Sequence, residues 1–224
     1  MKPKKLKFKA TNTAGEVGAL LLAPDDARWL LVFAHGAGAG MHHPFMEEMG
    51  LRLATRGVAT FRYQFPYLEH GGKRPDPKPI LLATVRSAIE VASRSAPGLT
   101  VLAGGKSMGG RMTSQAAAEE PLPGVHGLVF FGFPLHPAGA PSTGRAAHLP
   151  NVDLPMLILQ GTRDALADLT LLTPICRNLG KRTTLHVVDG ADHSFHVLKS
   201  SGRTDGEVLD ELADEVVRWA RKIG

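Results

Sequence analysis

Short apolar runs alternate with longer amphipathic segments along most of the chain. The apolar runs predict strands at residues 17–22, 29–35, 58–63, 100–104, 127–133, 156–160 and 183–188. From residue 58 onward these runs are mostly continuous, which is typical of strands covered on both faces. Between them, apolar residues at helical spacing predict helices at residues 44–55, 80–95, 108–119, 165–178 and 206–222. Pro174 predicts a break in the fourth helix near Thr173.

This alternation of strands and helices predicts an α/β fold with a mainly parallel sheet and right-handed crossovers. Residues 5–10 alternate lysine with apolar side chains, and no helix separates them from the strand at 17–22. We therefore expect an antiparallel hairpin at one edge of the sheet. The 224 residues contain no repeat or low-complexity linker, so a single domain over residues 1–224 is predicted. In such a sheet, ligands bind beyond the carboxyl ends of the strands.

The net charge of +5 raises the question of a nucleic-acid partner. Five lysines fall within the first nine residues, which hold no acid: Lys2, Lys4, Lys5, Lys7 and Lys9. Without them, basic and acidic residues are equal in number, whereas a nucleic-acid footprint would spread over the folded body. The segment is typical of an edge strand whose lysines discourage edge-to-edge pairing, with a functional basic arm as the alternative. No nucleic-acid partner is predicted.

The remaining composition excludes several classes of protein. One cysteine rules out an internal disulfide framework and a multi-cysteine zinc site. The apolar runs fall far short of the roughly 18 residues that a membrane helix needs. No secretory signal pattern is visible at the N-terminus. The sequence therefore predicts a cytoplasmic protein without a membrane partner.

The most specific chemical signal is the segment Gly105-Lys106-Ser107-Met108-Gly109. It follows a predicted strand and opens a predicted helix, the context of a nucleophile elbow, in which a sharp turn exposes the central side chain. Ser107 is the predicted nucleophile, and the flanking glycines would relieve steric clashes at the turn. The alternative is a glycine-rich turn in which Ser107 only caps the helix.

A serine nucleophile needs a base, and the base needs an acid to orient it. Asp164 follows the strand at 156–160 and is the predicted acid, although it could also cap the next helix. His193 follows the strand at 183–188 and is the predicted base. The rivals are Asp168, predicted one turn into the helix, and His196, farther from its strand. The chain order Ser107, Asp164, His193 matches one class of hydrolase.

An oxyanion hole needs backbone N–H groups aimed at the developing negative charge. The amide of Met108, directly after the nucleophile, is the first expected donor. The second is assigned to Ala37 in the glycine-rich run that follows the strand at 29–35, with Gly36 or Gly38 as alternatives. A phosphate-binding loop is disfavoured because this run lacks the G-K-[ST] ending.

Together, the segments HGAGAG, GGKSMGGR, GTRD and DHSF resemble the α/β-hydrolase superfamily. The chain is similar in particular to the small lidless, dienelactone-hydrolase-related branch that includes Tex-thirty-like proteins. The resemblance implies a mostly parallel eight-stranded sheet with helices on both faces, no large cap domain, and the triad Ser107, Asp164 and His193. Dienelactone hydrolases carry a cysteine nucleophile, whereas this elbow holds Ser107. The lone Cys176 lies in an apolar helical stretch and is predicted to be core.

The loops at the strand ends suggest an open pocket. Residues 134–150 hold several prolines and are too short for a lid domain, and residues 66–79 form the other long loop. The pocket candidates are His35, Gly36, Phe45, Phe65, Tyr67, Phe133 and Phe195. No cofactor and no metal is predicted, since nothing fixes the spacing of the loop histidines His42, His43 and His136. An internal salt bridge is favoured for Arg111, with a substrate carboxylate as the alternative partner.

The sequence thus predicts a serine hydrolase that cleaves a small carboxylic ester or related acyl substrate. Two alternatives stay open: a catalytically silent scaffold or binding protein, and an acyltransferase that uses the same triad. Neither the specific ester nor the oligomeric state follows from these residues.

Overall fold

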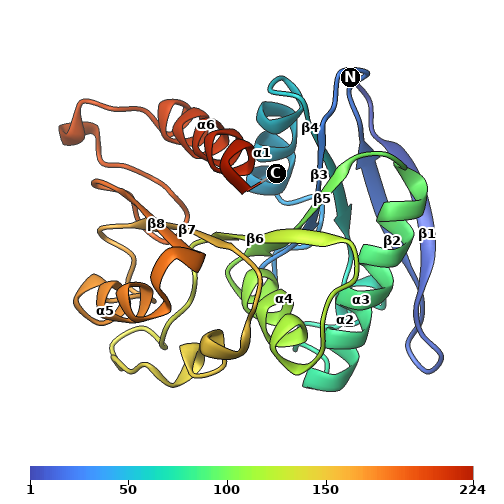
Figure 1. Cartoon of the computed structure of the whole chain (residues 1–224), viewed down its shortest axis with the longest axis horizontal. Coiled ribbons are helices and arrows are strands. Elements are labelled where there is room, and N and C mark those ends of the chain that lie inside the picture. Colours follow the sequence, from blue (N-terminus) through green and yellow to red (C-terminus); the bar gives the residue numbers. More distant parts are fainter. Residues whose placement is uncertain (224) are drawn as a thin grey trace.

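Eight strands form one sheet in the order β1-β2-β4-β3-β5-β6-β7-β8 in the computed structural model, which describes residues 1–223 (Figure 1). The strands are β1 (Lys4–Thr11), β2 (Gly15–Leu22), β3 (Trp29–Ala34), β4 (Val58–Tyr63), β5 (Thr100–Lys106), β6 (Val125–Phe131), β7 (Met156–Gly161) and β8 (Thr183–Val188). β2 pairs antiparallel with β1 and β4, and all the other neighbours are parallel. The predicted α/β fold with a mostly parallel sheet is therefore confirmed.

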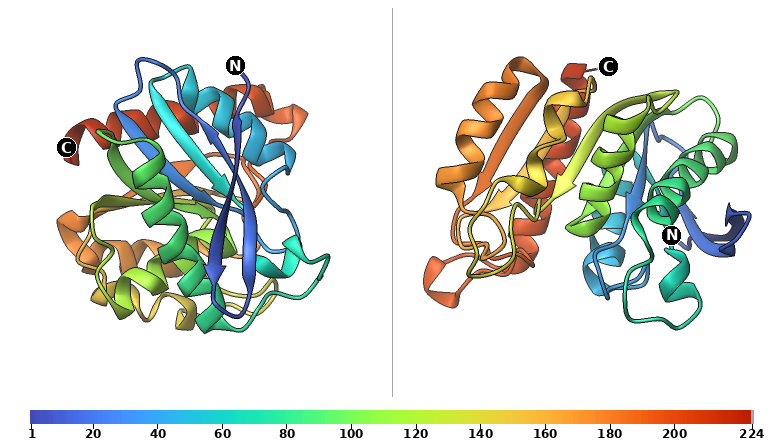
Figure 2. Two further views of the ribbon diagram at one scale, coloured as in Figure 1. Left: turned by 90° about the vertical axis from the view of Figure 1, so that its right-hand side faces the viewer. Right: turned by 90° about the horizontal axis from the view of Figure 1, so that it is seen from below.

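Helices cover both faces of this sheet. They are α1 (Pro44–Ala54), α2 (Pro66–Glu69), α3 (Lys78–Ser95), α4 (Met108–Glu119), α5 (Leu169–Leu179) and α6 (Asp205–Ile223). α1 and α6 lie on one face, and α3, α4 and α5 on the other (Figures 1 and 2). The central strands are buried on both sides: in β3, Leu31 packs toward α1 and α6, whereas Leu30 and Val32 pack toward α3 and α4. This explains the continuous apolar runs in the sequence.

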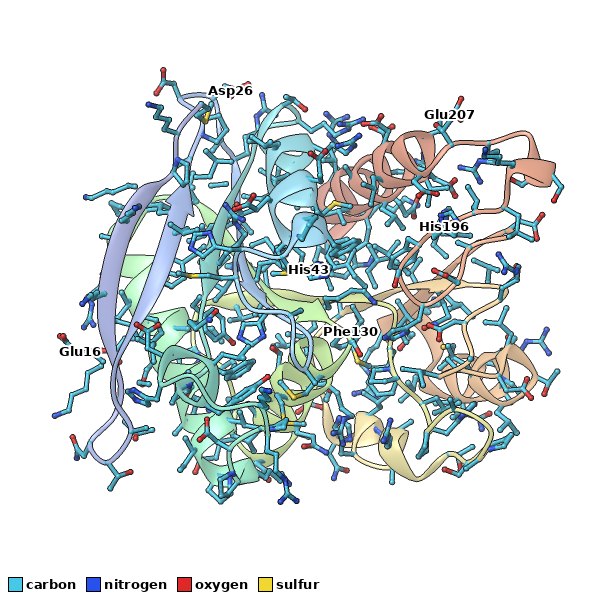
Figure 3. All side chains as sticks on the ribbon, turned by 180° about the vertical axis from the view of Figure 1, so that it is seen from behind. Glu16, Asp26, His43, Phe130, His196 and Glu207 are labelled. Carbon is cyan, nitrogen blue, oxygen red and sulfur yellow. The ribbon has the colours of Figure 1, made fainter. Side chains whose placement is uncertain are left out.

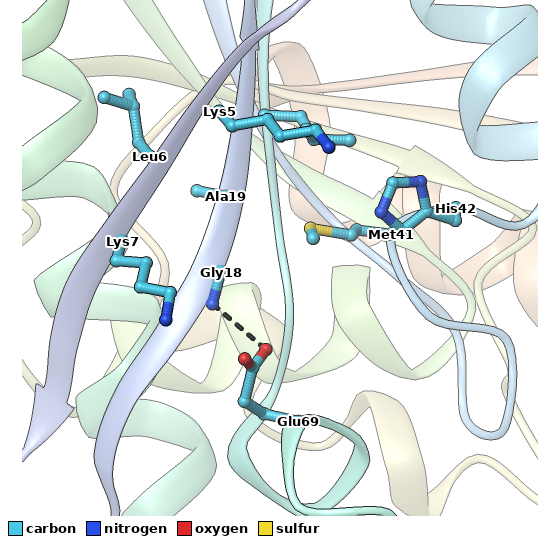
Figure 4. Close-up of a pocket in the computed structure, with 9 residues that line it drawn as sticks. Lys5, Leu6, Lys7, Gly18, Ala19, Met41, His42 and Glu69 are labelled. Atoms are coloured by element: carbon cyan, nitrogen blue, oxygen red, sulfur yellow. Dashed lines mark hydrogen bonds between the residues drawn. The ribbon is translucent and has the colours of Figure 1, made fainter.

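The β1–β2 hairpin forms one edge of the sheet (Figure 2). Phe8 is buried against the rings of Phe61 and Tyr63, with centroids 6.0 and 6.1 Å away. Lys5, Lys7 and Lys9 are exposed on the other side of the strand. This is the predicted edge-strand arrangement. A surface hollow beside the hairpin is lined in part by Lys5, Lys7, His42 and Glu69, and the Gly18 N–H donates to Glu69 Oε2 there over 3.0 Å (Figure 4).

Two predictions for the fourth amphipathic segment were wrong. α5 begins at Leu169 rather than at residue 165, because Asp168 provides the N-cap and accepts the Thr170 N–H over 2.7 Å. The helix also continues through Pro174 instead of breaking near Thr173. Proline removes one backbone hydrogen bond, but the buried side chains Leu172, Cys176 and Leu179 hold both turns against the sheet.

The connections at the carboxyl ends of the strands carry no large cap. Between β6 and β7 lie only two short 3₁₀ turns, η1 (Gly144–Ala146) and η2 (Leu149–Asn151). Between β4 and α3 lies only the single-turn α2. In the described part of the chain, no helix combines the length and apolar character needed to cross a bilayer.

Candidate active site

Ser107 occupies a strained turn between β5 and α4. Its backbone angles are φ 51° and ψ −116°, and Ser107 and Phe195 are the non-glycine residues with positive φ among residues 1–223. A Cβ at Gly105 would lie 2.4 Å from the Ala34 carbonyl oxygen, and one at Gly109 would lie 2.5 Å from the same atom. The glycines therefore let α4 and the end of β5 approach the backbone of β3, and this close approach holds Ser107 in its strained conformation.

The side chains of Ser107, His193 and Asp164 form one chain of hydrogen bonds. His193 Nε2 lies 2.9 Å from Ser107 Oγ, and His193 Nδ1 lies 2.7 Å from Asp164 Oδ2. Because the carboxylate can only accept, Nδ1 carries the proton and Nε2 is free to accept from the serine hydroxyl. Ser107, Asp164 and His193 follow the carboxyl ends of β5, β7 and β8. Because these strands are parallel, the three residues meet at the same end of the sheet.

The Asp164 carboxylate accepts hydrogen bonds from two other groups besides the imidazole of His193. Its side chain is fully buried, whereas that of His193 is 25% exposed. Asp164 Oδ1 accepts the Leu166 N–H over 2.7 Å, and Gln160 Nε2 donates to Oδ2 over 2.5 Å. These bonds satisfy the buried carboxylate and fix its orientation. Gln160, at the end of β7, carried no recognisable signal in the sequence.

The two rivals in the sequence lie elsewhere. Asp168 is half-buried and caps α5, and its hydrogen bonds to Thr170 lower its pKa. His196 is exposed and pairs with Asp205 over 2.8 Å, and this carboxylate raises the pKa of the imidazole. Neither residue joins the hydrogen bonds to Ser107.

The glycine-rich loop after β3 lies beside Ser107. Gly36 and Ala37 line the same pocket as Ser107, and a Cβ at Gly36 would lie 3.6 Å from Ser107 Cβ. The Gly38 N–H donates to Tyr67 Oη over 3.3 Å, so that amide is already engaged. Met108 is the first residue of α4, where the N–H groups have no partner within the helix.

His35 supports this loop from beneath. It is buried, its Nδ1–H donates to the Gly36 carbonyl over 2.8 Å, and its Nε2 accepts the Phe65 N–H over 3.0 Å. Burial lowers the pKa of His35 to about 4, so the ring is neutral at physiological pH. Phe65 and Tyr67 pack against the imidazole, with ring centroids 5.0 and 6.2 Å away.

A pocket of about 360 Å³ opens at the triad, and its lining includes His43. His43 is the N-cap of α1 and lies at the start of that helix (Figure 3). Its lining comprises Gly36, Ala37, Ala39, His43, Phe45, Met46, Lys106, Ser107, Leu166, His193 and Ser194. Of the predicted pocket residues, Gly36 and Phe45 line it. The structure places the other five outside the lining, buried in the layers behind it: His35, Phe65, Tyr67, Phe133 and Phe195. The loops at 66–79 and 134–150 contribute nothing to this lining.

Other candidate residues have separate roles. The favoured salt bridge of Arg111 does not form: within residues 1–223 it has no ion-pair partner, and its Nε is buried without a hydrogen bond. His42 pairs with Glu47 over 3.2 Å, and His136 accepts the Asp168 N–H over 2.9 Å. The described residues contain no cluster of three potential metal-binding side chains. Cys176 is buried in α5, and burial raises the pKa of its thiol to about 11.

The sheet and the elbow are those of α/β hydrolases. The chain matches the alpha/beta hydrolase domain family over residues 27–221 and belongs to that family. It resembles XC6422 from Xanthomonas campestris, an α/β serine hydrolase without a lid, with a TM-score of 0.75, 19% identity, and coverage of 98% of this chain and 95% of that one.

Two further solved structures share the fold. One is dienelactone hydrolase from Anabaena variabilis, with a TM-score of 0.74, 21% identity, and coverage of 100% of this chain and 99% of that one. The other is the esterase domain of a Rhodothermus marinus protein, with a TM-score of 0.73, 19% identity, and full coverage (100%) of both chains. At these identities the likeness shows the fold, here the lidless form.

Proposed function

We propose that the protein is a serine hydrolase that cleaves small carboxylic esters. The observation that carries this proposal is the continuous set of hydrogen bonds from Ser107 through His193 to the buried Asp164, at the wall of an open pocket. The esterase and hydrolase names of the structurally similar proteins agree with it. This chemistry requires no metal or organic cofactor.

In the proposed reaction, Ser107 Oγ attacks the ester carbonyl while His193 Nε2 takes the hydroxyl proton. Asp164 keeps the imidazole in the required tautomer and stabilises the imidazolium. The amides of Ala37 and Met108 hold the oxyanion. The alcohol then leaves with the proton from His193, and the acyl group remains on Ser107. His193 next takes a proton from water, the resulting nucleophile attacks the acyl-enzyme, and the acid is released as the proton returns to Ser107.

The pocket favours a short acyl or alcohol group. Ala37, Ala39, Phe45, Met46 and Leu166 provide apolar walls, and a volume of about 360 Å³ is at the small end for ligand pockets. Because no large cap covers the strand ends, the pocket opens directly to solvent. Short esters such as p-nitrophenyl acetate and butyrate are therefore suitable first substrates.

The direct test is Ser107→Ala assayed on both esters. We expect turnover to fall at least about 1000-fold, with an unchanged melting temperature. Ser93→Ala is the matched control, because the Ser93 hydroxyl only donates to the Ile89 carbonyl of its own helix. A fluorophosphonate probe should label the wild type and the control but not Ser107→Ala. Wild-type protein that neither turns over ester nor takes the label would contradict the proposal.

A further inference from the structure

Lys106 lies immediately before the proposed nucleophile and reaches the loop of the proposed base. Its Nζ donates to the His193 carbonyl oxygen over 2.5 Å. The same ammonium lies 5.7 Å from the ring centroid of Phe45 and 5.4 Å from that of Phe195, distances at which a cation is attracted to an aromatic face. The two rings are themselves stacked, 5.8 Å apart with an interplanar angle of 17°. Lys106 therefore joins the end of β5 to both α1 and the His193 loop.

The loop that carries His193 is a tight turn built around Asp192. The Asp192 carboxylate accepts the N–H groups of Ser194 and His196 over 2.8 and 3.0 Å. Phe195 takes a positive φ of 65°, which turns its ring into the interior against Phe45. These bonds define the shape of the turn. The bond from Lys106 connects the turn to the strand that carries Ser107.

The ammonium also lies close to the imidazole. A Cβ at Gly132 would lie 3.0 Å from Lys106 Nζ and 3.4 Å from both His193 Nδ1 and Cε1, so the two groups face the same small space. Burial lowers the pKa of Lys106 to about 8, and the nearby carboxylates of Asp164 and Asp192 oppose this decrease. The other titratable group on the pocket wall is His43, whose Nδ1 caps α1 by accepting the Phe45 N–H.

We propose that Lys106 is a positioning residue: through its bond to the His193 carbonyl, it fixes His193 at hydrogen-bonding distance from Ser107. The proposal rests on the proposed hydrolase function. The benefit of Lys106 to turnover comes from this geometry.

The test compares Lys106→Met, which keeps most of the aliphatic stem, with Lys106→Arg, which keeps a cationic donor. For Lys106→Met we expect kcat to fall about tenfold, because a small displacement of the base lowers the rate. KM should stay within about threefold. Lys106→Arg should recover most of kcat.

Lys78→Met is the matched control, since Lys78 pairs with Glu119 on the surface over 2.6 Å. It should leave kcat and KM unchanged. If Lys106→Met does not fold, Lys106→Gln replaces it in the same comparison. A fall of less than twofold in kcat for Lys106→Met would overturn the proposal, and so would a failure of Lys106→Arg to recover kcat.

A measurement without turnover separates this proposal from the proposed function. NMR signals of the His193 ring should shift in Lys106→Met relative to the wild type, and Lys106→Arg should restore them. If the wild type lacks Ser107-dependent activity but the ring signals still shift, the hydrolase function fails and the role of Lys106 stands. If activity is present and the ring signals do not shift, the role of Lys106 fails alone.

Discussion

The elbow turn (residues 105–109) and the base loop (residues 189–196) meet at one pocket, and each contains a non-glycine residue with positive φ. These are Ser107, with φ 51°, and Phe195, with φ 65°. The elbow turn is held by backbone approaching backbone, because Gly105 and Gly109 lie against the carbonyl of Ala34. The base loop combines backbone bonds, such as that from the Arg163 N–H to the Ala191 carbonyl, with side-chain contacts of Asp192 and Phe195.

This difference decides what a substitution does to each region. At the elbow turn, an added methyl group meets main-chain atoms that cannot move without shifting a strand or a helix. At the base loop, losing a side chain removes contacts while the space stays open. Substitutions of the elbow glycines Gly105 and Gly109 should therefore affect the whole fold, and side-chain losses in the base loop should mainly affect the rate.

Gly109→Ala should have the largest effect. Its Cβ would lie 2.5 Å from the Ala34 carbonyl oxygen and 2.6 Å from that of His35, so α4 must move away from β3. We expect a loss of about 3 kcal/mol or more in the free energy of unfolding, a fall of about 10 °C in the melting temperature, and no detectable esterase activity. Gly144→Ala is the control, because nothing lies within 4 Å of its added Cβ. A stable, active Gly109→Ala would show that close backbone approach does not define the elbow turn.

Asp164→Asn should leave the fold intact and remove most of the activity. The amide can no longer enforce the imidazole tautomer, and we expect kcat to fall about 1000- to 10,000-fold. Asp168→Asn is the matched control, because asparagine is also a good helix cap and Asp168 lies outside the triad. Steady-state kinetics on p-nitrophenyl butyrate decides the outcome. Similar losses in the two variants would contradict the assignment of the acid.

Asp192→Ala should have a smaller effect, confined to the base loop. The N–H groups of Ser194 and His196 lose their acceptor, so His193 is less well positioned, and we expect kcat to fall about tenfold. Asp189→Ala serves as the control because Asp189 is exposed and accepts only a 3.4 Å hydrogen bond from Thr162. If both variants keep wild-type kcat, the Asp192 turn has no part in placing the base.

pH should affect the two regions with opposite sign. His35, beneath the loop next to the elbow turn, has its pKa lowered to about 4, so the unfolded state binds more protons between about pH 4 and 6.5. Its contribution to stability is lost as pH falls through this window, by about 2 kcal/mol between pH 7 and 5. The pKa of His196, in the base loop, is raised by Asp205. Its smaller contribution is present at low pH and is lost as pH rises through the raised pKa.

Urea unfolding of the wild type, His35→Gln and His196→Gln at pH 5, 7 and 8.5 would measure both contributions. His35→Gln should lose less stability than the wild type between pH 7 and 5. His196→Gln should differ from the wild type mainly at pH 5. A wild type that is as stable at pH 5 as at pH 7 would contradict the role given to His35.

The same contrast explains which features were predictable from the sequence. The elbow turn depends on glycines at fixed spacing after an apolar run, so Ser107 and its neighbours can be recognised from the linear sequence alone. Asp164 and His193 were predicted from their places after strands, and the structure brings them within hydrogen-bonding distance of each other and of Ser107. The distances themselves depend on strand order and register, which no local pattern encodes.

The pocket was harder to predict because the direction of a loop side chain depends on distant contacts. Phe195 was expected at the pocket, but its positive φ turns it inward against Phe45. Lys106 was seen only as an unspecified position in the elbow motif, and its partners come from α1 and the base loop. The start of α5 was misplaced for a related reason: Asp164 and Asp168 are equally good caps by type, and tertiary contacts buried only the first.

The position of β8 at the far edge of the sheet has a consequence for the order of folding events. Ser107 lies at the centre of the sheet on β5, whereas His193 follows the last strand, which pairs with β7. A refolding chain can complete the elbow turn from β3, β5 and α4 before the C-terminal quarter has docked. Recovery of ester hydrolysis should therefore lag behind recovery of the central secondary structure, which makes catalysis a reporter of the final strand addition.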